Sequence, residues 1–202
     1  MKNILKELGD RYTNRNYRKR LKNDNFTILC SNCIGGVVSH YCGKEFLSPT
    51  VNLWIRQDDF IKLCCNLKWY MAQKLEFIKT SENYPVARCG DITIHFNHDN
   101  IEQEAEAKWE RRKKRINYNN LYIVMYVGDG ITEEDIRKLE SVPCKNKVVL
   151  SPVETTFRLP YVKYFKPNGT DWLSMRGMER DIFGIRSIMK QFDFIEFLNE
   201  GV

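Results

Sequence analysis

The segment after the first apolar run carries small, polar and thiol side chains suited to holding a ligand. Residues 26–30 form an apolar run of strand length, and the candidate ligand contacts directly after it are Ser31, Asn32, Cys33, Gly35 and Gly36. Ligands of open α/β sheets bind beyond the carboxyl ends of strands, where N–H groups at the start of the next helix attract anions. We therefore predict that residues 31–36 lie at the carboxyl end of a central strand and hold an anionic group, with a purely structural turn as the alternative.

A second candidate segment, residues 91–98, contains His95 and His98, two of the three histidines of the chain. Apolar and polar residues alternate here as in a half-buried strand, which places Asp91 and His95 on the same face. A histidine near a strand end can act as a general base. We predict that His95 is the base, that Asp91 orients it, and that His98 contacts the substrate. The alternative is that His95 is a hydrogen-bonded residue of the polar face and that His98 lies near a helix cap.

The thiol of Cys33 is a candidate nucleophile, because a helix N-terminus favours the thiolate and His95 could accept its proton. The alternative is that Cys33 only forms the wall of a pocket. Cys30 and Cys33 form a C-x-x-C pair, but Cys30 belongs to the apolar run, and no second pair has the spacing of a zinc site. With an odd total of seven cysteines, we predict free thiols and no structural disulfide, metal or cofactor.

Three arginines, Arg111, Arg112 and Arg115, lie at the end of a helix predicted over residues 101–116. A guanidinium pairs with phosphate oxygens in a forked geometry, so these side chains could bind a sugar phosphate or another anionic small molecule. The alternative is a solvated helix end whose positive charge offsets the helix dipole. We expect no nucleic-acid partner, because no stacking aromatic motif or docking motif accompanies the basic run.

The elements that must position these residues predict an α/β fold with a mixed, largely parallel sheet flanked by helices. A strand over 121–127, a helix over 132–141 and a strand over 147–150 form a strand–helix–strand unit, which implies parallel pairing. A closing amphipathic helix is predicted over 179–198. A chain of 202 residues with 43% hydrophobic side chains can bury a single large core. We predict one α/β domain over residues 25–202, with two lobes dividing near residues 100–120.

Residues 1–24 are predicted to form a separate, strongly basic helical segment in a chain of net charge +6. This helix either packs across the core with a solvated outer face or contacts anionic lipid or phosphate. No stretch of about 20 apolar residues could span a bilayer, and charges interrupt the N-terminus where a signal peptide would be apolar. We expect a cytoplasmic protein, in contact with the inner membrane face if the basic helix binds lipid.

Four ordered sequence blocks, residues 25–36, 46–54, 91–98 and 104–112, resemble a bacterial family of unknown function. Its members are often labelled exopolysaccharide biosynthesis proteins, and the resemblance covers most of the chain beyond residue 20. The family implies no established catalytic residues. The chain departs from the expected pattern at residues 37–39, where an aromatic side chain would follow the glycines, so we assign no role to His40.

The resemblance implies a transferase-like protein of cell-surface polysaccharide biosynthesis that binds an anionic or sugar-bearing substrate. Such an enzyme would act on glycans or nucleotide sugars. The alternative is a non-catalytic accessory protein that contacts a glycosyltransferase or the membrane surface.

Overall fold

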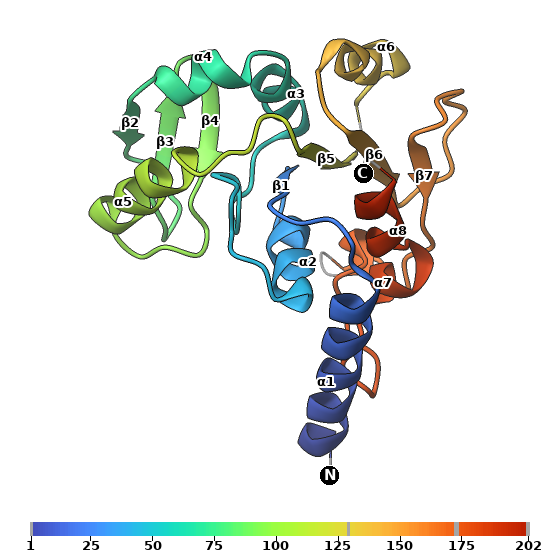
Figure 1. Cartoon of the computed structure of the whole chain (residues 1–202). Coiled ribbons are helices and arrows are strands. Elements are labelled where there is room, and N and C mark those ends of the chain that lie inside the picture. Colours follow the sequence, from blue (N-terminus) through green and yellow to red (C-terminus); the bar gives the residue numbers. More distant parts are fainter. Residues whose placement is uncertain (1, 129, 172–173, 201–202) are drawn as a thin grey trace.

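The computed structural model describes residues 2–128, 130–171 and 174–200, and seven strands in these ranges form two sheets (Figure 1). The four-stranded sheet is parallel throughout and has the order β1 (Thr27–Cys30), β5 (Leu121–Tyr126), β6 (Asn146–Ser151) and β7 (Val162–Tyr164). The antiparallel sheet contains β2 (Leu75–Ile78), β3 (Val86–Cys89) and β4 (Ile92–His95). The predicted α/β class is confirmed, and the antiparallel strands form a sheet of their own.

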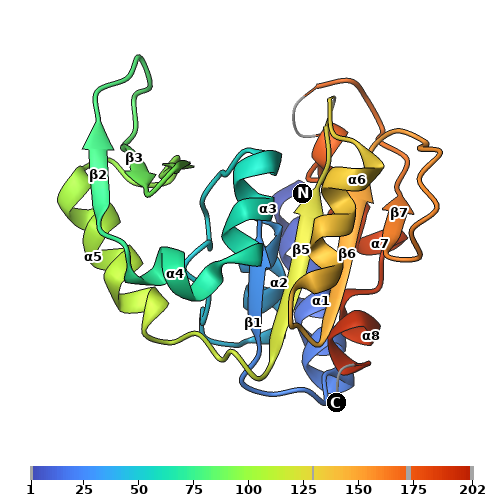
Figure 2. The same ribbon diagram turned by 90° about the horizontal axis from the view of Figure 1, so that it is seen from above.

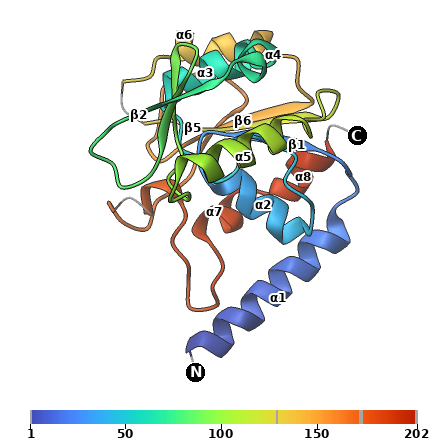
Figure 3. The ribbon, with the colours of Figure 1, turned by 90° about the vertical axis from the view of Figure 1, so that its left-hand side faces the viewer.

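Helices cover both faces of the parallel sheet (Figure 3). One face packs against α3 (Gln57–Cys65), α4 (Leu67–Ala72), α6 (Glu133–Arg137) and the antiparallel sheet with α5 (Glu102–Lys113). The other face packs against α1 (Lys2–Arg20), α2 (Ile34–Cys42), α7 (Ser187–Gln191) and α8 (Phe194–Asn199). Two short 3-10 helices, η1 (Lys138–Ser141) and η2 (Ser174–Arg176), complete these elements. Within the described ranges, none of the helices combines the length and the apolar character needed to cross a bilayer.

Strand β5 lies between the two hydrophobic clusters and divides its side chains between them. All six of its residues are buried. Leu121, Ile123 and Met125 pack into the cluster on the α3 side. Tyr122, Val124 and Tyr126 pack into the cluster on the α2 side. The amino-acid sequence of β5 is therefore one continuous apolar run, because a parallel strand covered on both faces has no solvent-facing side.

The antiparallel sheet is an insertion between α4 and β5, and it lies beside the parallel sheet together with α5 (Figure 2). Its inward side chains, such as Ile92 and Ile94, join the same hydrophobic cluster as Leu29 and Met125 of the parallel sheet. Trp109 of α5 is also fully buried in this cluster. One continuous core therefore joins the insertion to the main sheet.

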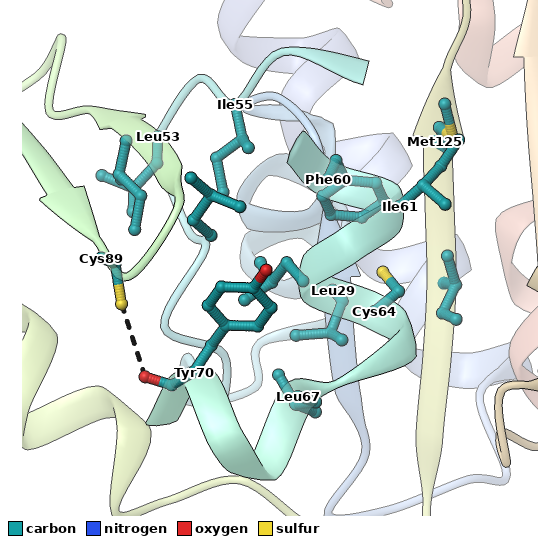
Figure 4. Close-up of a cluster of buried hydrophobic side chains, with 14 of the residues drawn as sticks. Leu29, Leu53, Ile55, Phe60, Ile61, Cys64, Leu67, Tyr70, Cys89 and Met125 are labelled. Atoms are coloured by element: carbon teal, nitrogen blue, oxygen red, sulfur yellow. Dashed lines mark hydrogen bonds between the residues drawn. The ribbon is translucent and has the colours of Figure 1, made fainter. Parts of the chain in front are cut away.

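Residues 48–57, which we call the crossing segment, connect the two sheets through their backbones. Trp54 and His95 exchange two backbone hydrogen bonds of 3.0 Å, and the Ile55 N–H donates to the Ser31 carbonyl at 3.2 Å. Leu53 and Ile55 point into the hydrophobic cluster beside Phe60 (Figure 4). The crossing segment thus fixes the end of β4 against the end of β1.

Helix α2 approaches the crossing segment so closely that it needs glycine at position 36. A Cβ atom added to Gly36 would lie 2.8 Å from the Asn52 Oδ1 atom and 3.1 Å from the Val51 Cγ1 atom. On the inner side of the helix, a Cβ added to Gly35 would lie 2.9 Å from the Cys30 Cβ atom. The two glycines therefore let α2 pack between β1 and the crossing segment.

Two of our expectations about the elements are wrong. Residues 31–36 follow the carboxyl end of β1 as predicted, but β1 is an edge strand of its sheet and not a central one. The helix predicted over 179–198 is replaced by a loop followed by α7 and α8. Asp181 stabilises that loop, because its Oδ1 atom accepts the N–H groups of Phe183 and Ile185 at 2.9 Å, and Gly184 adopts a positive φ of 81°.

Candidate functional site

A pocket of about 280 Å³ lies at the carboxyl ends of β1, β5 and β6. Its described lining comes from five segments of the chain, and we call it the strand-end pocket. The lining residues are Ser31, Asn32, Trp54, Ile55, Arg56, Gln57, Tyr126, Val127, Gly128, Pro152, Val153, Met175 and Arg176. This is the edge at which open parallel sheets bind their ligands.

Asn32 lines the strand-end pocket and carries a buried hydrogen-bond donor. Its side chain is 6% exposed, and its Oδ1 atom accepts the Ile34 N–H at 3.0 Å and the Cys30 thiol at 3.4 Å. Within the described part of the chain, its Nδ2 atom has no hydrogen-bond partner. A buried polar group without a partner is costly, so an acceptor on a ligand would offset this cost.

Tyr126, at the end of β5, lines the same pocket and carries a second buried group without a partner among the described residues. The residue is 9% exposed, and its hydroxyl has no hydrogen-bond partner among the described residues. Its backbone is held firmly, because the Tyr126 N–H donates to the Ser31 Oγ atom at 3.0 Å. Burial raises the pKa of Tyr126 well above its ordinary value, so the phenol keeps its proton and can donate it to a ligand.

Arg176, the last residue of η2, adds positive charge to the pocket lining. Burial lowers the pKa of its guanidinium, and a guanidinium is still charged at neutral pH. The positive charge of Arg176 favours the ionised forms of the Tyr126 hydroxyl and of the Cys33 thiol, so it lowers the pKa of both groups. The described lining therefore combines donors from an amide, a phenol and a guanidinium.

Trp54 and His95 form an aromatic pair at the wall of the pocket. Their ring centroids are 4.3 Å apart with an interplanar angle of 55°, and Trp54 lines the pocket. The Nδ1 atom of His95 lies 3.5 Å from the Tyr84 hydroxyl. Burial lowers the pKa of His95, although the charges of Glu82 and Asp59 oppose that shift. His95 is therefore placed to support Trp54, and it is not among the described lining residues.

The predicted pairing of Asp91 with His95 is wrong. The Asp91 carboxylate accepts the Tyr70 hydroxyl at 2.7 Å and the Lys62 ammonium at 2.9 Å, and these bonds lower its pKa. Asp91 precedes β4 and His95 ends it, so the strand separates them by about 13 Å at 3.3 Å per residue. The two residues therefore lie too far apart to form a hydrogen bond.

Cys33 meets His98 and not the predicted His95. The Cys33 Sγ atom lies 3.1 Å from the His98 Nε2 atom, next to the pocket residue Asn32. Burial raises the pKa of the Cys33 thiol, and the charges of Arg186 and Arg176 oppose that shift. The thiol is therefore protonated at neutral pH, and His98 is the group placed to accept its proton.

The remaining predicted contacts lie outside the described lining of the strand-end pocket. Gly35 and Gly36 lie inside α2 and are not among the described lining residues of the pocket. Arg112 donates to the Val51 carbonyl at 2.9 Å, and Arg115 pairs with Glu45 at 2.5 Å. Arg111 is exposed on α5. The three arginines do not line the strand-end pocket, and Arg112 and Arg115 instead tie the end of α5 to neighbouring loops.

Sequence reasoning did not find Trp54, Tyr126 or Arg176. Tyr126 ends an apolar run, and nothing in its spacing distinguishes it from the core residues before it. Arg176 lies about 50 residues further along the chain, at the end of the short helix η2, and no sequence motif marks it. All seven cysteines are free thiols in the structure, and the described residues contain no cluster of three or more potential metal ligands.

A larger hollow, of about 580 Å³, lies at the amino end of β6 beside α8. Lysines and carboxylates with access to solvent line it, among them Lys145, Lys163 and Glu196. None of its described lining residues has a buried polar atom without a partner. The strand-end pocket is therefore the stronger candidate for a ligand site.

Residues 4–199 match the model of a protein family described as "Domain of unknown function (DUF1919)". An uncharacterized protein of Haemophilus influenzae is 33% identical over 197 residues, which cover 94% of this chain and 92% of that protein. The similarity therefore extends across both sheets and the strand-end pocket.

Removing the hydroxyl of Tyr126 should stabilise the folded protein. In Tyr126→Phe, the unpartnered buried hydroxyl is lost, so we expect the free energy of unfolding to rise by about 1 kcal/mol in urea titrations. Tyr122→Phe on the same strand is the matched control. Its hydroxyl donates to the Leu198 carbonyl at 2.8 Å and accepts from the Asn23 amide, so we expect a loss of about 1 kcal/mol. A loss of stability in both variants would show that the Tyr126 hydroxyl has a partner.

The lowered pKa of His95 predicts a pH dependence of stability. The unfolded chain takes up a proton near pH 6.5 and the folded chain only at lower pH, so the free energy of unfolding should fall as the pH drops below about 6.5. His95→Gln should lose part of this fall between pH 7 and pH 5.5 in thermal melts. His40→Gln, which removes an exposed imidazole, should keep it. Equal pH profiles for native protein and His95→Gln would contradict the assignment.

Proposed function

Since this chain belongs to the DUF1919 family, whose function is unknown, we propose that it binds a small sugar phosphate in the strand-end pocket, as a transferase-like protein of cell-surface polysaccharide biosynthesis. The observation that carries the binding proposal is that two residues lining one pocket, Asn32 and Tyr126, each have a buried polar atom without a partner among the described residues, the Asn32 Nδ2 atom and the Tyr126 hydroxyl. The polysaccharide context comes from the resemblance of the four sequence blocks.

The polar groups of the pocket select for a ligand rich in hydrogen-bond acceptors. The Asn32 amide nitrogen and the Arg176 guanidinium are pure donors, and the Tyr126 phenol keeps its proton. Phosphate oxygens are suitable partners for such donors, and the guanidinium adds a favourable charge. The Trp54 ring supplies apolar surface against which the C–H groups of a sugar ring can pack.

The size of the pocket favours a monosaccharide phosphate over a complete nucleotide sugar. Its volume of about 280 Å³ is at the lower end of the range of roughly 300–1,000 Å³ typical of small-molecule sites. A sugar phosphate, or the sugar phosphate part of a larger molecule, is of the right order for such a space. The orientation of Asn32 supports this assignment. Its Oδ1 atom accepts the Ile34 N–H, so its Nδ2 donor points away from that hydrogen bond.

Isothermal titration calorimetry with glucose 1-phosphate tests this function, with glucose and inorganic phosphate as comparison ligands. Arg176→Gln should weaken binding of glucose 1-phosphate by about 10- to 100-fold, because a hydrogen bond to a charged group contributes roughly 1.5–3 kcal/mol. Lys145→Gln, which removes one positive charge from the larger hollow, is the matched control and should bind like the native protein. Tyr126→Phe should bind more weakly although it folds more stably.

Two results would refute the proposal. One is failure of glucose 1-phosphate and of a panel of other hexose phosphates and UDP-hexoses to bind. The other is binding that is lost equally in Lys145→Gln and in Arg176→Gln, because that would place the ligand elsewhere or reveal a non-specific charge effect.

Group transfer through a thiol is a second candidate function, and the contact of 3.1 Å between Cys33 and His98 favours it. The Cys33 proton would pass to His98 while the sulfur attacks the sugar carbon that carries the phosphate. The phosphate would leave with the electron pair of the broken C–O bond and take the proton from His98. An acceptor hydroxyl would then give its proton to His98 and attack the same carbon, and the released sulfur would recover the proton.

This thiol route predicts that Cys33→Ser abolishes the release of inorganic phosphate from a sugar 1-phosphate and the addition of one sugar to the intact protein mass. Cys65→Ser, at a half-buried thiol of α3, should retain both. If Cys33→Ser releases phosphate as the native protein does, the thiol route is wrong. That result would leave the binding proposal unaffected, because calorimetry measures binding separately.

A further inference from the structure

The amino-terminal part of helix α1 extends away from the rest of the protein (Figures 1 and 3). The inner face of the helix packs against the cluster on the α2 side. Thr13 and Tyr17 are buried, and the Tyr17 ring meets the Tyr41 ring edge-on at 5.7 Å. A Cβ atom added to Gly9 would lie 1.7 Å from the Phe183 carbonyl oxygen. The loop over residues 181–184 is therefore pressed against the outer half of α1.

This end of the molecule exposes an unusual amount of large apolar surface. Leu8 is 54% exposed, Tyr12 67%, Ile182 70% and Phe183 47%. Leu8 and Tyr12 are four residues apart, so they lie on the same face of the helix, and the contact at Gly9 brings Phe183 beside them. We call these four residues the apolar tip.

Positive charge accompanies the apolar tip on the outer face of α1. Arg11, Arg15 and Lys19 follow one another at four-residue intervals, so they form one row beside Leu8 and Tyr12. All three are exposed, and none of them forms an ion pair with another described side chain. The same row begins with Glu7, one turn before Arg11, and Asp10 of this helix is paired with Arg180.

We propose that the outer face of α1 and the apolar tip bind the surface of an anionic phospholipid membrane. Basic side chains beside an anionic leaflet attract it, and apolar side chains of an interfacial helix enter the boundary between headgroups and acyl chains. A symmetric contact between two copies would place Arg11, Arg15 and Lys19 of one chain against the same basic face of the other. Like charges oppose such a dimer, whereas anionic lipid neutralises them.

The proposal concerns a surface separate from the lining of the strand-end pocket, and it holds whether or not that pocket binds a sugar phosphate. Co-sedimentation of the full chain with vesicles of phosphatidylcholine containing phosphatidylglycerol tests it. We expect the native protein to bind these vesicles, to be released by added salt, and to bind weakly to pure phosphatidylcholine.

The triple variant Arg11→Glu, Arg15→Glu, Lys19→Glu should bind roughly 100-fold more weakly or worse, because each basic residue near an anionic surface contributes about fivefold. The control is the triple variant Lys74→Glu, Lys79→Glu, Arg88→Glu, which makes the same change in net charge at exposed positions of the antiparallel sheet region. We expect the control to bind nearly as well as the native protein. Equal losses in both triple variants would overturn the proposal, because net charge and not this face would then control binding.

Substitution of Ile182 and Phe183 by serine separates the apolar contribution from the charge. These exposed positions should tolerate the change without loss of the thermal unfolding transition, and we expect binding to phosphatidylglycerol vesicles to fall at least tenfold. Unchanged vesicle binding would overturn the role of the apolar tip. The membrane proposal would also be overturned if the native protein did not bind vesicles but formed a dimer in light scattering. If the serine variant were then monomeric, the partner of this surface would be a second copy of the chain.

Discussion

The backbone pairing of the crossing segment is the constraint on which the candidate site depends. Trp54 takes up both backbone hydrogen bonds with His95 at the end of β4, and the next residue, Ile55, donates to Ser31 after β1. Buried backbone N–H and C=O groups need hydrogen-bond partners. The crossing segment supplies them at the ends of β1 and β4, and it thereby joins the two sheets. This join places Trp54 in the pocket wall, His95 behind it, and His98 within reach of Cys33.

The strand-end pocket combines rigid support with unsatisfied polar groups. The Asn32 Oδ1 atom accepts the Ile34 N–H, and the Tyr126 N–H donates to the Ser31 hydroxyl oxygen. The Asn32 Nδ2 atom and the Tyr126 hydroxyl have no partner among the described residues. Such groups lower the stability of the folded chain, and natural proteins accept that loss mainly where a ligand supplies the partner. The arrangement explains recognition of an acceptor-rich ligand more directly than it explains any one reaction.

One stretch of the chain connects the pocket to the outer end of α1. Arg176 lines the pocket, and the loop that begins there reaches Ile182 and Phe183 beside Gly9 before it returns to α7. Glu179 lies between these points, and its carboxylate oxygens are buried without a partner among the described residues. The packing of this loop therefore positions both Arg176 in the pocket lining and Ile182 and Phe183 in the apolar tip.

Local sequence patterns determined the elements of this protein, and tertiary structure decided which side chains meet. The strand alternation at residues 91–98 and the helices over 101–116 and 132–141 depend on neighbours within a few residues, so the sequence alone predicted those elements. The position of residues 31–36 after a buried strand was predicted for the same reason. Cys33 was paired with the wrong histidine because strand geometry says nothing about how the turn after His95 brings His98 back to α2. Tyr126 and Arg176 enter the pocket from β5 and from a loop about 50 residues further on, and only the packing of both against β1 brings them together.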